Sequence, residues 1–341
     1  MFLLSRPLLC LCLMAGLAFG CGPGGTPPAA VEAQTSLRDR VSERPGLRGR
    51  IAERRAARQG DAQGMTISAG GLTRSYHVNV PSGVGAQPAA LLVFHGGGGS
   101  GARMRDQHPI DAASEAGNFI AVYPDAVDGN WTDGRIGTAG GPDDVAFVRA
   151  LIDRLRQDHG VDPGRVFATG ISNGAMFTHK LACDAPGLVR AIAPVAGNMP
   201  EALAAACAPG RGTPVMMFNG TDDPLMPYQG GRPELDGLLR AARGPATDQM
   251  TSSEATADFW ARINGCGGRS QTDLPASHND GTTVTRLDWS CGADRVVLFR
   301  INGGGHTWPG SSAPARRMTG KTSREIDATT TMVDFFRSYG L

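Results

Sequence analysis

The sequence predicts an α/β fold, with one central, mostly parallel sheet and helices on both of its faces. Continuous apolar runs of a few residues recur along the chain, and such runs are typical of strands buried on both sides of a parallel sheet. Helix-length stretches with apolar residues three and four apart lie between these runs. The predicted buried strands are Ala89–Phe94, Phe119–Tyr123, Arg165–Ile171, Ala191–Val195, Val215–Phe218 and Val296–Ile301.

The start of the chain is typical of an export signal. Residues 1–21 carry one charge, Arg6, and the apolar stretch Pro7–Phe19 is short for a membrane span. Small residues before Cys21 are similar to a lipoprotein cleavage site, although Ala18 stands where such sites usually have Leu. Lipid attachment at Cys21 and ordinary cleavage at the same place both stay open. Either predicts a secreted or periplasmic protein, and lipidation would tether it to a membrane, as in an outer-membrane lipoprotein.

A Gly- and Pro-rich tether and an Arg-rich arm occupy residues 22–64. Residues 38–58 hold eight Arg, which suits contact with an anionic membrane or envelope polymer, or simply a solvated helix. The folded domain is expected over 65–341. The whole chain has 341 residues, a net charge of +1 and 41% hydrophobic residues, so it can build a core and has no global charge footprint for nucleic acid.

The remaining elements follow in a regular order. Thr66–Ala69 and Thr73–Val80 alternate polar and apolar residues like an opening antiparallel hairpin. A helix is predicted over Asp143–Asp158, whose acidic start suits capping better than chemistry. Further helices are predicted over Ala175–Ala182, Ser253–Ile263 and Ser323–Tyr339.

The segment Gly170–Gly174 has the pattern of a nucleophile elbow. It reads Gly-Ile-Ser-Asn-Gly, and it lies between a predicted strand and a predicted helix, as a G-x-S-x-G elbow requires. Small flanking residues let strand and helix approach closely, so that the Ser172 hydroxyl stands clear at the carboxyl end of the sheet. The alternative is a tight turn with a serine cap.

A serine nucleophile needs a base and an acid from later in the chain. His278 lies in a polar stretch, whereas His306 follows a predicted strand in a glycine-rich loop, so His306 is the expected base. A structural histidine in a glycine turn is the alternative. The acid should follow the strand after the elbow helix, and the residues leave Asp222 and Asp223 as equal candidates.

The loop His95–Gly101 is rich in glycine and supplies a candidate oxyanion hole. The Asn173 amide would give one N–H donor, and Gly97, or next Gly98, the other. The same loop also fits a dinucleotide-binding fingerprint, G-x-G-x-x-G at 96–101 followed by Asp125. Glycine-dense segments match many patterns, and exported proteins rarely meet NAD, so the oxyanion interpretation is favoured.

Seven short segments of the chain, taken in sequence order, resemble those of a known enzyme family. The chain resembles the polyhydroxybutyrate depolymerase-like esterases, a family that includes feruloyl and acetylxylan esterases. The resemblance implies an α/β-hydrolase fold over about 65–341, and ester hydrolysis by a Ser-Asp-His triad without a cofactor. The matching segments are HGGGG, NWTDGR, DDVAFVRALID, GISNGAMF, APVAGNMP, NGTDDPLMPYQGG and GGGHTWPG.

The resemblance also assigns individual residues. It selects Asp223 as the acid, and it shows Asn219 where the family usually has His. It places Trp131 and Trp308 beside the cleft, against the acyl or alcohol group, with core packing as the alternative. It fits two disulfides, Cys183–Cys207 and Cys266–Cys291, which do not have metal-binding spacing.

The expected protein is an exported serine esterase with an ester as its partner, no metal and no nucleic acid. The resemblance favours short hydroxyalkanoate esters of the polyhydroxybutyrate type, or polyester oligomers. Feruloyl or acetyl esters of plant polysaccharide are the second candidate substrate. A non-catalytic envelope-binding protein built on a hydrolase fold is the alternative from another class.

Overall fold

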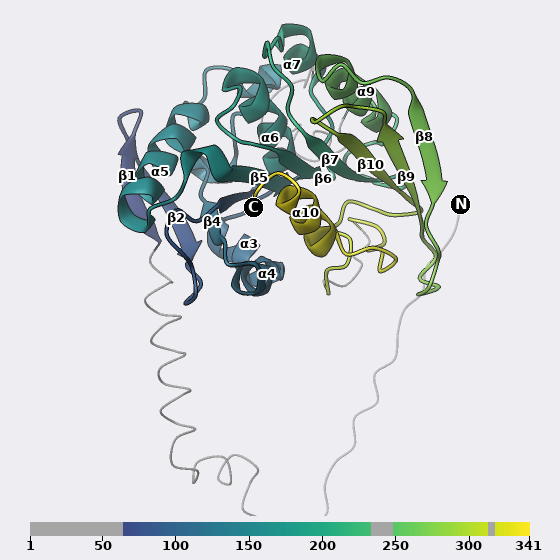
Figure 1. Ribbon diagram of the computed structural model, residues 1–341. Helices are drawn as coiled ribbons and strands as arrows, with labels where there is room; N and C mark the ends of the chain where they lie inside the picture. The colour runs from purple at the N-terminus through teal and green to yellow at the C-terminus, as the bar shows by residue number, and fades with distance from the viewer. Residues whose placement is uncertain (1–63, 233–247, 313–317) are drawn as a thin grey trace, which may run out of the picture. The chain divides into compact units, whose positions relative to one another are not determined.

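The computed structural model describes residues 64–232, 248–312 and 318–341, and these build one ten-stranded sheet (Figure 1). The strand order is β1-β2-β4-β3-β5-β6-β7-β10-β9-β8. The six strands from β4 to β10 in this order run parallel, and the two strands at each edge add antiparallel connections. The strands are β1 (Met65–Ala69), β2 (Leu72–Asn79), β3 (Ala90–Phe94), β4 (Ile120–Pro124), β5 (Val166–Ile171), β6 (Ile192–Val195), β7 (Val215–Gly220), β8 (Arg269–Asp273), β9 (Thr283–Trp289) and β10 (Val296–Asn302).

The α/β class and the predicted strands are confirmed. Each of the six predicted apolar runs is a strand of the parallel part of the sheet, and the predicted hairpin is β1–β2. The apolar pattern does not predict strands β8 and β9. Strand β8 reads Arg-Ser-Gln-Thr-Asp and is exposed along its whole length, so it has no apolar periodicity to detect. It pairs on one side only, with β9, at the edge of the sheet.

Helices cover both faces of the sheet, as expected. In Figure 1, α5, α6, α7 and α9 lie on one face, and α3, α4 and α10 lie on the other. Helices α3, α4 and α7 are short, and the sequence pattern does not predict them. The helices are α3 (Gly101–Gln107), α4 (Ile110–Gly117), α5 (Asp144–His159), α6 (Asn173–Asp184), α7 (Glu201–Ala206), α9 (Ser253–Ile263) and α10 (Ala328–Arg337).

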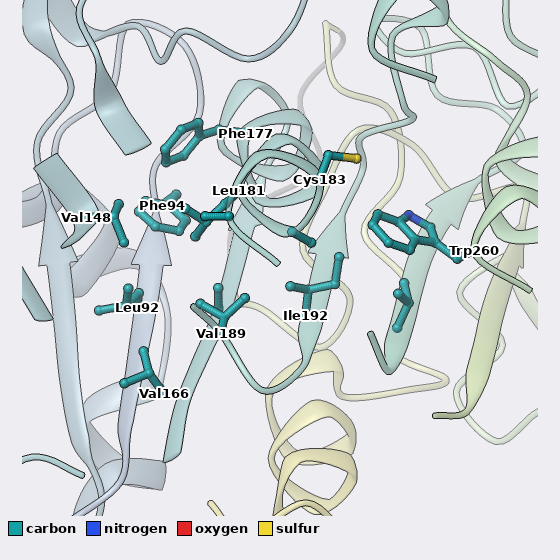
Figure 2. Packing of buried hydrophobic residues seen from close by; sticks show 14 of the residues in the cluster. Leu92, Phe94, Val148, Val166, Phe177, Leu181, Cys183, Val189, Ile192 and Trp260 are labelled. Carbon is teal, nitrogen blue, oxygen red and sulfur yellow. The ribbon is translucent and has the colours of Figure 1, made fainter. Parts of the chain in front are cut away.

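Two hydrophobic layers hold the helices to the sheet. Alternate residues of each parallel strand point to opposite faces, so Leu92 and Phe94 of β3 belong to one layer and Leu91 and Val93 to the other. Figure 2 shows the first layer, with Phe94 near Phe177 of α6. These two rings meet edge to face at 5.0 Å. This packing fixes α6 over the carboxyl ends of β3 and β5.

Capping side chains set the limits of two predicted helices. Asp143 accepts a hydrogen bond from the Ala146 amide at 2.8 Å, so α5 begins where the acidic pair predicts. Helix α10 is expected from Ser323 but begins at Ala328, because Asp327 caps it through the Thr330 amide at 2.7 Å. The caps confirm that Asp143 has a structural role.

Both expected disulfides are present. Cys183–Cys207 joins the last turn of α6 to the end of α7, and Cys266–Cys291 joins the segment after α9 to the segment after β9. Each closes a loop of 24 or 25 residues. On the chain-entropy argument each stabilises the fold by about 3 kcal/mol.

The expected export signal, Cys21, the tether and the Arg-rich arm lie outside the described residues. None of the helices in the described ranges is long and apolar enough to cross a lipid bilayer.

Candidate active site

The turn between β5 and α6 holds Ser172 in a conformation that few residues adopt. Its φ of 58° and ψ of −120° lie outside the regions that L-residues populate, and such strain costs about 1–3 kcal/mol. The surrounding backbone enforces it: the Ser172 amide donates to Val195 O at 3.0 Å, and the Met176 amide donates to Ser172 O at 3.0 Å. Ser172 is therefore displayed at the carboxyl edge of the sheet, at the start of α6.

Two glycines make this turn possible. A Cβ on Gly170 would lie 2.8 Å from Phe94 O, and a Cβ on Gly174 would lie 2.6 Å from His95 O. Both distances are too short for real carbon–oxygen contacts. The glycine spacing in the sequence therefore has a steric cause, which is the close approach of α6 to β3 and β5.

Asp223 and His306 form a buried pair at the ends of β7 and β10. His306 Nδ1 lies 2.7 Å from Asp223 Oδ2, and the two side chains are 8% and 2% exposed. Because a carboxylate only accepts, Nδ1 carries the proton and donates, which leaves Nε2 as the unprotonated ring nitrogen. This tautomer is the one that a general base needs.

The two candidate acids, Asp222 and Asp223, have different surroundings. Asp223 Oδ1 accepts from the amides of Leu225 and Met226, both at 2.8 Å, so the carboxylate is fixed from both sides. Asp222 is exposed, and its carboxylate accepts from the neighbouring Thr221 hydroxyl at 3.0 Å. Only Asp223 faces His306.

Backbone hydrogen bonds from residues 319–321 hold the loop that carries His306. The His306 amide donates to Thr319 O at 2.6 Å, and the Gly305 amide donates to Lys321 O at 2.9 Å. On the sheet side, a Cβ on Gly220 would lie 2.6 Å from the carbonyl carbon of Gly304, so the loop lies directly against the end of β7. The described hydrogen bonds connect His306 to Asp223 and include none from the Ser172 hydroxyl.

The two proposed oxyanion donors lie next to each other. A Cβ on Gly97 would be 3.7 Å from Asn173 Cβ, so the glycine loop passes close to the first turn of α6. The Gly98 amide donates to Gly129 O at 2.8 Å, and the Gly99 amide donates to Gly96 O at 3.0 Å. Gly98, the second candidate, is therefore already committed to another acceptor.

Comparison with known proteins now identifies the family. The chain is 31% identical over 293 residues to NocK of Nocardia uniformis subsp. tsuyamanensis, which is named as an esterase, and the match covers 83% of this chain and 85% of that protein. The chain belongs to the polyhydroxybutyrate depolymerase-like esterases. It is a carboxylic ester hydrolase with an α/β-hydrolase fold, which the comparison favours over a non-catalytic binding protein.

For two other relatives the match spans less than half of the relative's own length. The chain is 29% identical over 241 residues to feruloyl esterase B of Piromyces equi, which is 68% of this chain and 42% of that protein. It is 29% identical over 127 residues to poly(3-hydroxyalkanoate) depolymerase C of Paucimonas lemoignei, which is 35% of this chain and 30% of that protein. No family model matches the sequence.

A solved structure supports the fold. The acetyl xylan esterase from Aspergillus awamori superposes with a TM-score of 0.54 at 17% identity, over 80% of this chain and 98% of that one.

The side chain of Asn173 ties the elbow of this esterase to the loop after β4. Its Oδ1 accepts from the Trp131 amide at 2.8 Å, and its Nδ2 donates to Trp131 O at 3.1 Å and to Asp133 Oδ2 at 2.6 Å. Asp133 is fully buried and also pairs with Arg135 at 2.9 Å. The matched segment NWTDGR contains these partners, but the sequence alone shows no reason for them to contact Asn173.

The two tryptophans expected beside the cleft are buried in the core. Trp131 is 0% exposed and stacks on Phe177 at 5.0 Å, while its Nε1 donates to His95 O at 3.0 Å. Trp308 is 2% exposed, and its Nε1 donates to Thr329 Oγ1 at 3.0 Å. The expectation of substrate contact is wrong, because both indoles pack in the core, which is the alternative given for them.

His95 supports the glycine loop from below. Its Nδ1 lies 2.8 Å from Gly96 O, and its Nε2 accepts from the Ala126 amide at 3.1 Å, so Nδ1 carries the proton. Burial lowers the pKa of His95 below its ordinary value, against the raising effect of its hydrogen bond to Gly96. The ring is therefore a neutral brace between the glycine loop and the loop after β4.

The acidic residue of the dinucleotide alternative has another use. Asp125 Oδ1 accepts from the Gly101 amide at 2.7 Å, and Oδ2 accepts from the Ser75 hydroxyl at 2.8 Å. The carboxylate holds the glycine loop to β2, so both of the oxygens that would accept from a ribose hydroxyl are already in use.

Among the described residues, no group of three or more His, Cys, Asp and Glu side chains could hold a metal ion.

Proposed function

We propose that this esterase works through an acyl-enzyme formed on Ser172. The Ser172 hydroxyl attacks the ester carbonyl carbon while His306 Nε2 takes its proton. The resulting oxyanion accepts hydrogen bonds from the amides of Gly97 and Asn173. His306 then protonates the leaving alcohol. In the second half of the reaction a water molecule attacks the acyl carbon while His306 takes its proton, and His306 returns that proton to Ser172 as the acid is released. Asp223 holds the ring and stabilises the imidazolium.

The observation that carries this proposal is the buried pair of Asp223 and His306 at 2.7 Å. An aspartate that fixes Nδ1–H of a histidine leaves Nε2 directed as a base. The strained turn at Ser172 supplies the nucleophile at the same edge of the sheet, since β5, β7 and β10 are parallel and end together. A purely structural role would not explain both features.

The substrate we propose is a short hydroxyalkanoate ester or a polyester oligomer. The depolymerase from Paucimonas lemoignei supports this class, and feruloyl esterase B supports an aryl ester of plant polysaccharide as the second candidate. A panel of hydroxybutyrate oligomers, methyl ferulate and acetylated xylan separates them. Highest kcat/KM on the oligomers is the expected result, and highest kcat/KM on methyl ferulate or acetylated xylan would replace it.

We also propose that the protein is exported. Two disulfides among the described residues suit an oxidising compartment. Mass spectrometry of the mature protein from its host tests this. Cleavage before Cys21 is expected, and the added mass of acyl chains there would show a membrane tether. An intact residue 1 would contradict export.

The catalytic proposal is tested with p-nitrophenyl butyrate. We expect Ser172→Ala to lower kcat by at least about a thousandfold, because a serine enzyme without its nucleophile keeps only binding and oxyanion stabilisation. Ser290→Ala, at an exposed serine after β9, is the matched control and should keep wild-type activity. Equal activity of wild type and Ser172→Ala would overturn the mechanism.

A further inference from the structure

Asn130 places an amide side chain directly beside the oxyanion loop. A Cβ on Gly97 would lie only 3.1 Å from Asn130 Oδ1 and 3.7 Å from Asn173 Cβ. The Asn130 amide oxygen therefore covers the same side of Gly97 that faces the first turn of α6. Neither the expected site nor its resemblance to known esterases gives Asn130 a role.

One hydrogen bond decides which end of the amide faces the site. Asn130 Nδ2 donates to Asp128 O at 3.0 Å, and this uses the NH₂ group on the local turn. The oxygen is then the end near Gly97, and the described hydrogen bonds give it no donor. Asn130 is half-buried, so Oδ1 is an acceptor held at the edge of the site and open to a ligand.

The backbone on both sides of Asn130 is fixed to the catalytic elements. On one side Gly129 O accepts from the Gly98 amide at 2.8 Å. On the other side Trp131 exchanges two hydrogen bonds with the Asn173 side chain, at 2.8 and 3.1 Å. Asn130 itself donates its amide to Val127 O at 3.1 Å. The acceptor is therefore preorganised relative to the proposed oxyanion donors, which lowers the entropic cost of using it.

We propose that Asn130 Oδ1 accepts a hydrogen bond from a hydroxyl on carbon 2 or 3 of the substrate's acyl chain, and so selects hydroxyacyl esters. The inference rests on the proposed function, because it takes the carbonyl oxygen to lie at Gly97. The oxygen of a hydroxyl on carbon 3 is two carbon–carbon bonds and one carbon–oxygen bond, of about 1.5 Å each, from the carbonyl carbon. This short reach suits an acceptor that lies 3.1 Å from where a Cβ on Gly97 would be. The phenolic hydroxyl of a feruloyl group lies beyond a double bond and a whole ring, and is too far away.

The test compares p-nitrophenyl butyrate with p-nitrophenyl 3-hydroxybutyrate. We expect Asn130→Ala to lower kcat/KM for the hydroxy ester by about 3- to 10-fold, the value of one neutral hydrogen bond, and to leave butyrate within about twofold. Asn130→Asp keeps an acceptor oxygen, so it should retain the wild-type ratio between the two esters even if its charge slows both. Asn279→Ala, at an exposed asparagine between β8 and β9, is the matched control for an unchanged ratio.

Other outcomes overturn the inference. If Asn130→Ala changes kcat/KM equally for both p-nitrophenyl esters, or changes it for neither, Asn130 does not bind the hydroxyl. A second pair, ethyl butyrate and 2-hydroxyethyl butyrate, carries the hydroxyl on the alcohol side; loss of preference in that pair alone would assign Asn130 to the alcohol and contradict an acyl contact. Ser172→Ala tests the catalytic proposal separately, so the failure of that proposal can be told apart from the failure of this one.

Discussion

Acid should destabilise this esterase through a buried histidine that is not among its proposed catalytic residues. His179 on α6 is completely buried, and its Nδ1 accepts from Trp260 Nε1 of α9 at 3.0 Å. Burial lowers the pKa of His179 to about 4, and the nearby backbone of Gly197 has a weaker raising effect. Protonation would place a charge in the core and point an N–H at the Trp260 N–H, so the folded state resists it.

The size of the effect follows from linkage. In the unfolded chain the histidine has a pKa of about 6.5. Between that pH and the folded pKa of about 4, His179 is protonated in the unfolded state and neutral in the folded state. Stability is therefore present above pH 6.5 and is lost as the pH falls toward 4. Between pH 8 and pH 5, His179 should remove about 2 kcal/mol from the free energy of unfolding. That is a large part of a typical margin of about 5–15 kcal/mol.

Urea denaturation at pH 8 and pH 5 measures this directly. His179→Gln keeps an acceptor for Trp260 Nε1 but cannot titrate, so it should lose about 2 kcal/mol less than wild type between the two pH values. If His179→Gln and wild type lose stability equally, the argument from the buried His179 is refuted.

Three further predictions test the site and its supports. Asp223→Asn should lower kcat on p-nitrophenyl butyrate by about 10⁴-fold with the fold intact by circular dichroism, because the amide stabilises the wrong His306 tautomer; a loss under tenfold would contradict the pairing. Replacing both Cys266 and Cys291 by Ser should lower the free energy of unfolding by about 3 kcal/mol in urea, and no change would show that the β8–β9 edge is not braced by this bond. Trp131→Phe should cost about 1 kcal/mol of stability through the lost bond to His95 O and leave KM for short esters unchanged, whereas a raised KM would restore the substrate role that the family resemblance implies.

Local chemistry makes several features predictable from the sequence. The elbow at Ser172 is detectable because a strained turn between strand and helix needs glycine on both sides, and the steric contacts of Gly170 and Gly174 confirm that reason. The parallel strands are detectable as apolar runs, since both of their faces are buried. The edge strand β8 is not, because an exposed strand needs no apolar residue.

Contacts between distant segments are decided only by the tertiary structure. Residue type and spacing leave Asp222 and Asp223 equal, and the resemblance to known esterases favours Asp223. The orientation of the turn after β7 places one carboxylate against His306 and the other in solvent. The resemblance also implies that Trp131 faces substrate, but packing against Phe177 buries it.

The same division applies to Asn130 and Asn173. Each belongs to a segment that matches the family, yet 43 residues separate them, and no periodicity relates the two segments. Both lie beside Gly97, because β4 and β5 flank β3 in the sheet, which brings the loops that follow these strands to one edge. The sequence by itself determined which groups could do chemistry. The order of the strands determined which of them lie together, because side-chain contacts at a sheet edge depend on spatial neighbours and not on neighbours in the chain.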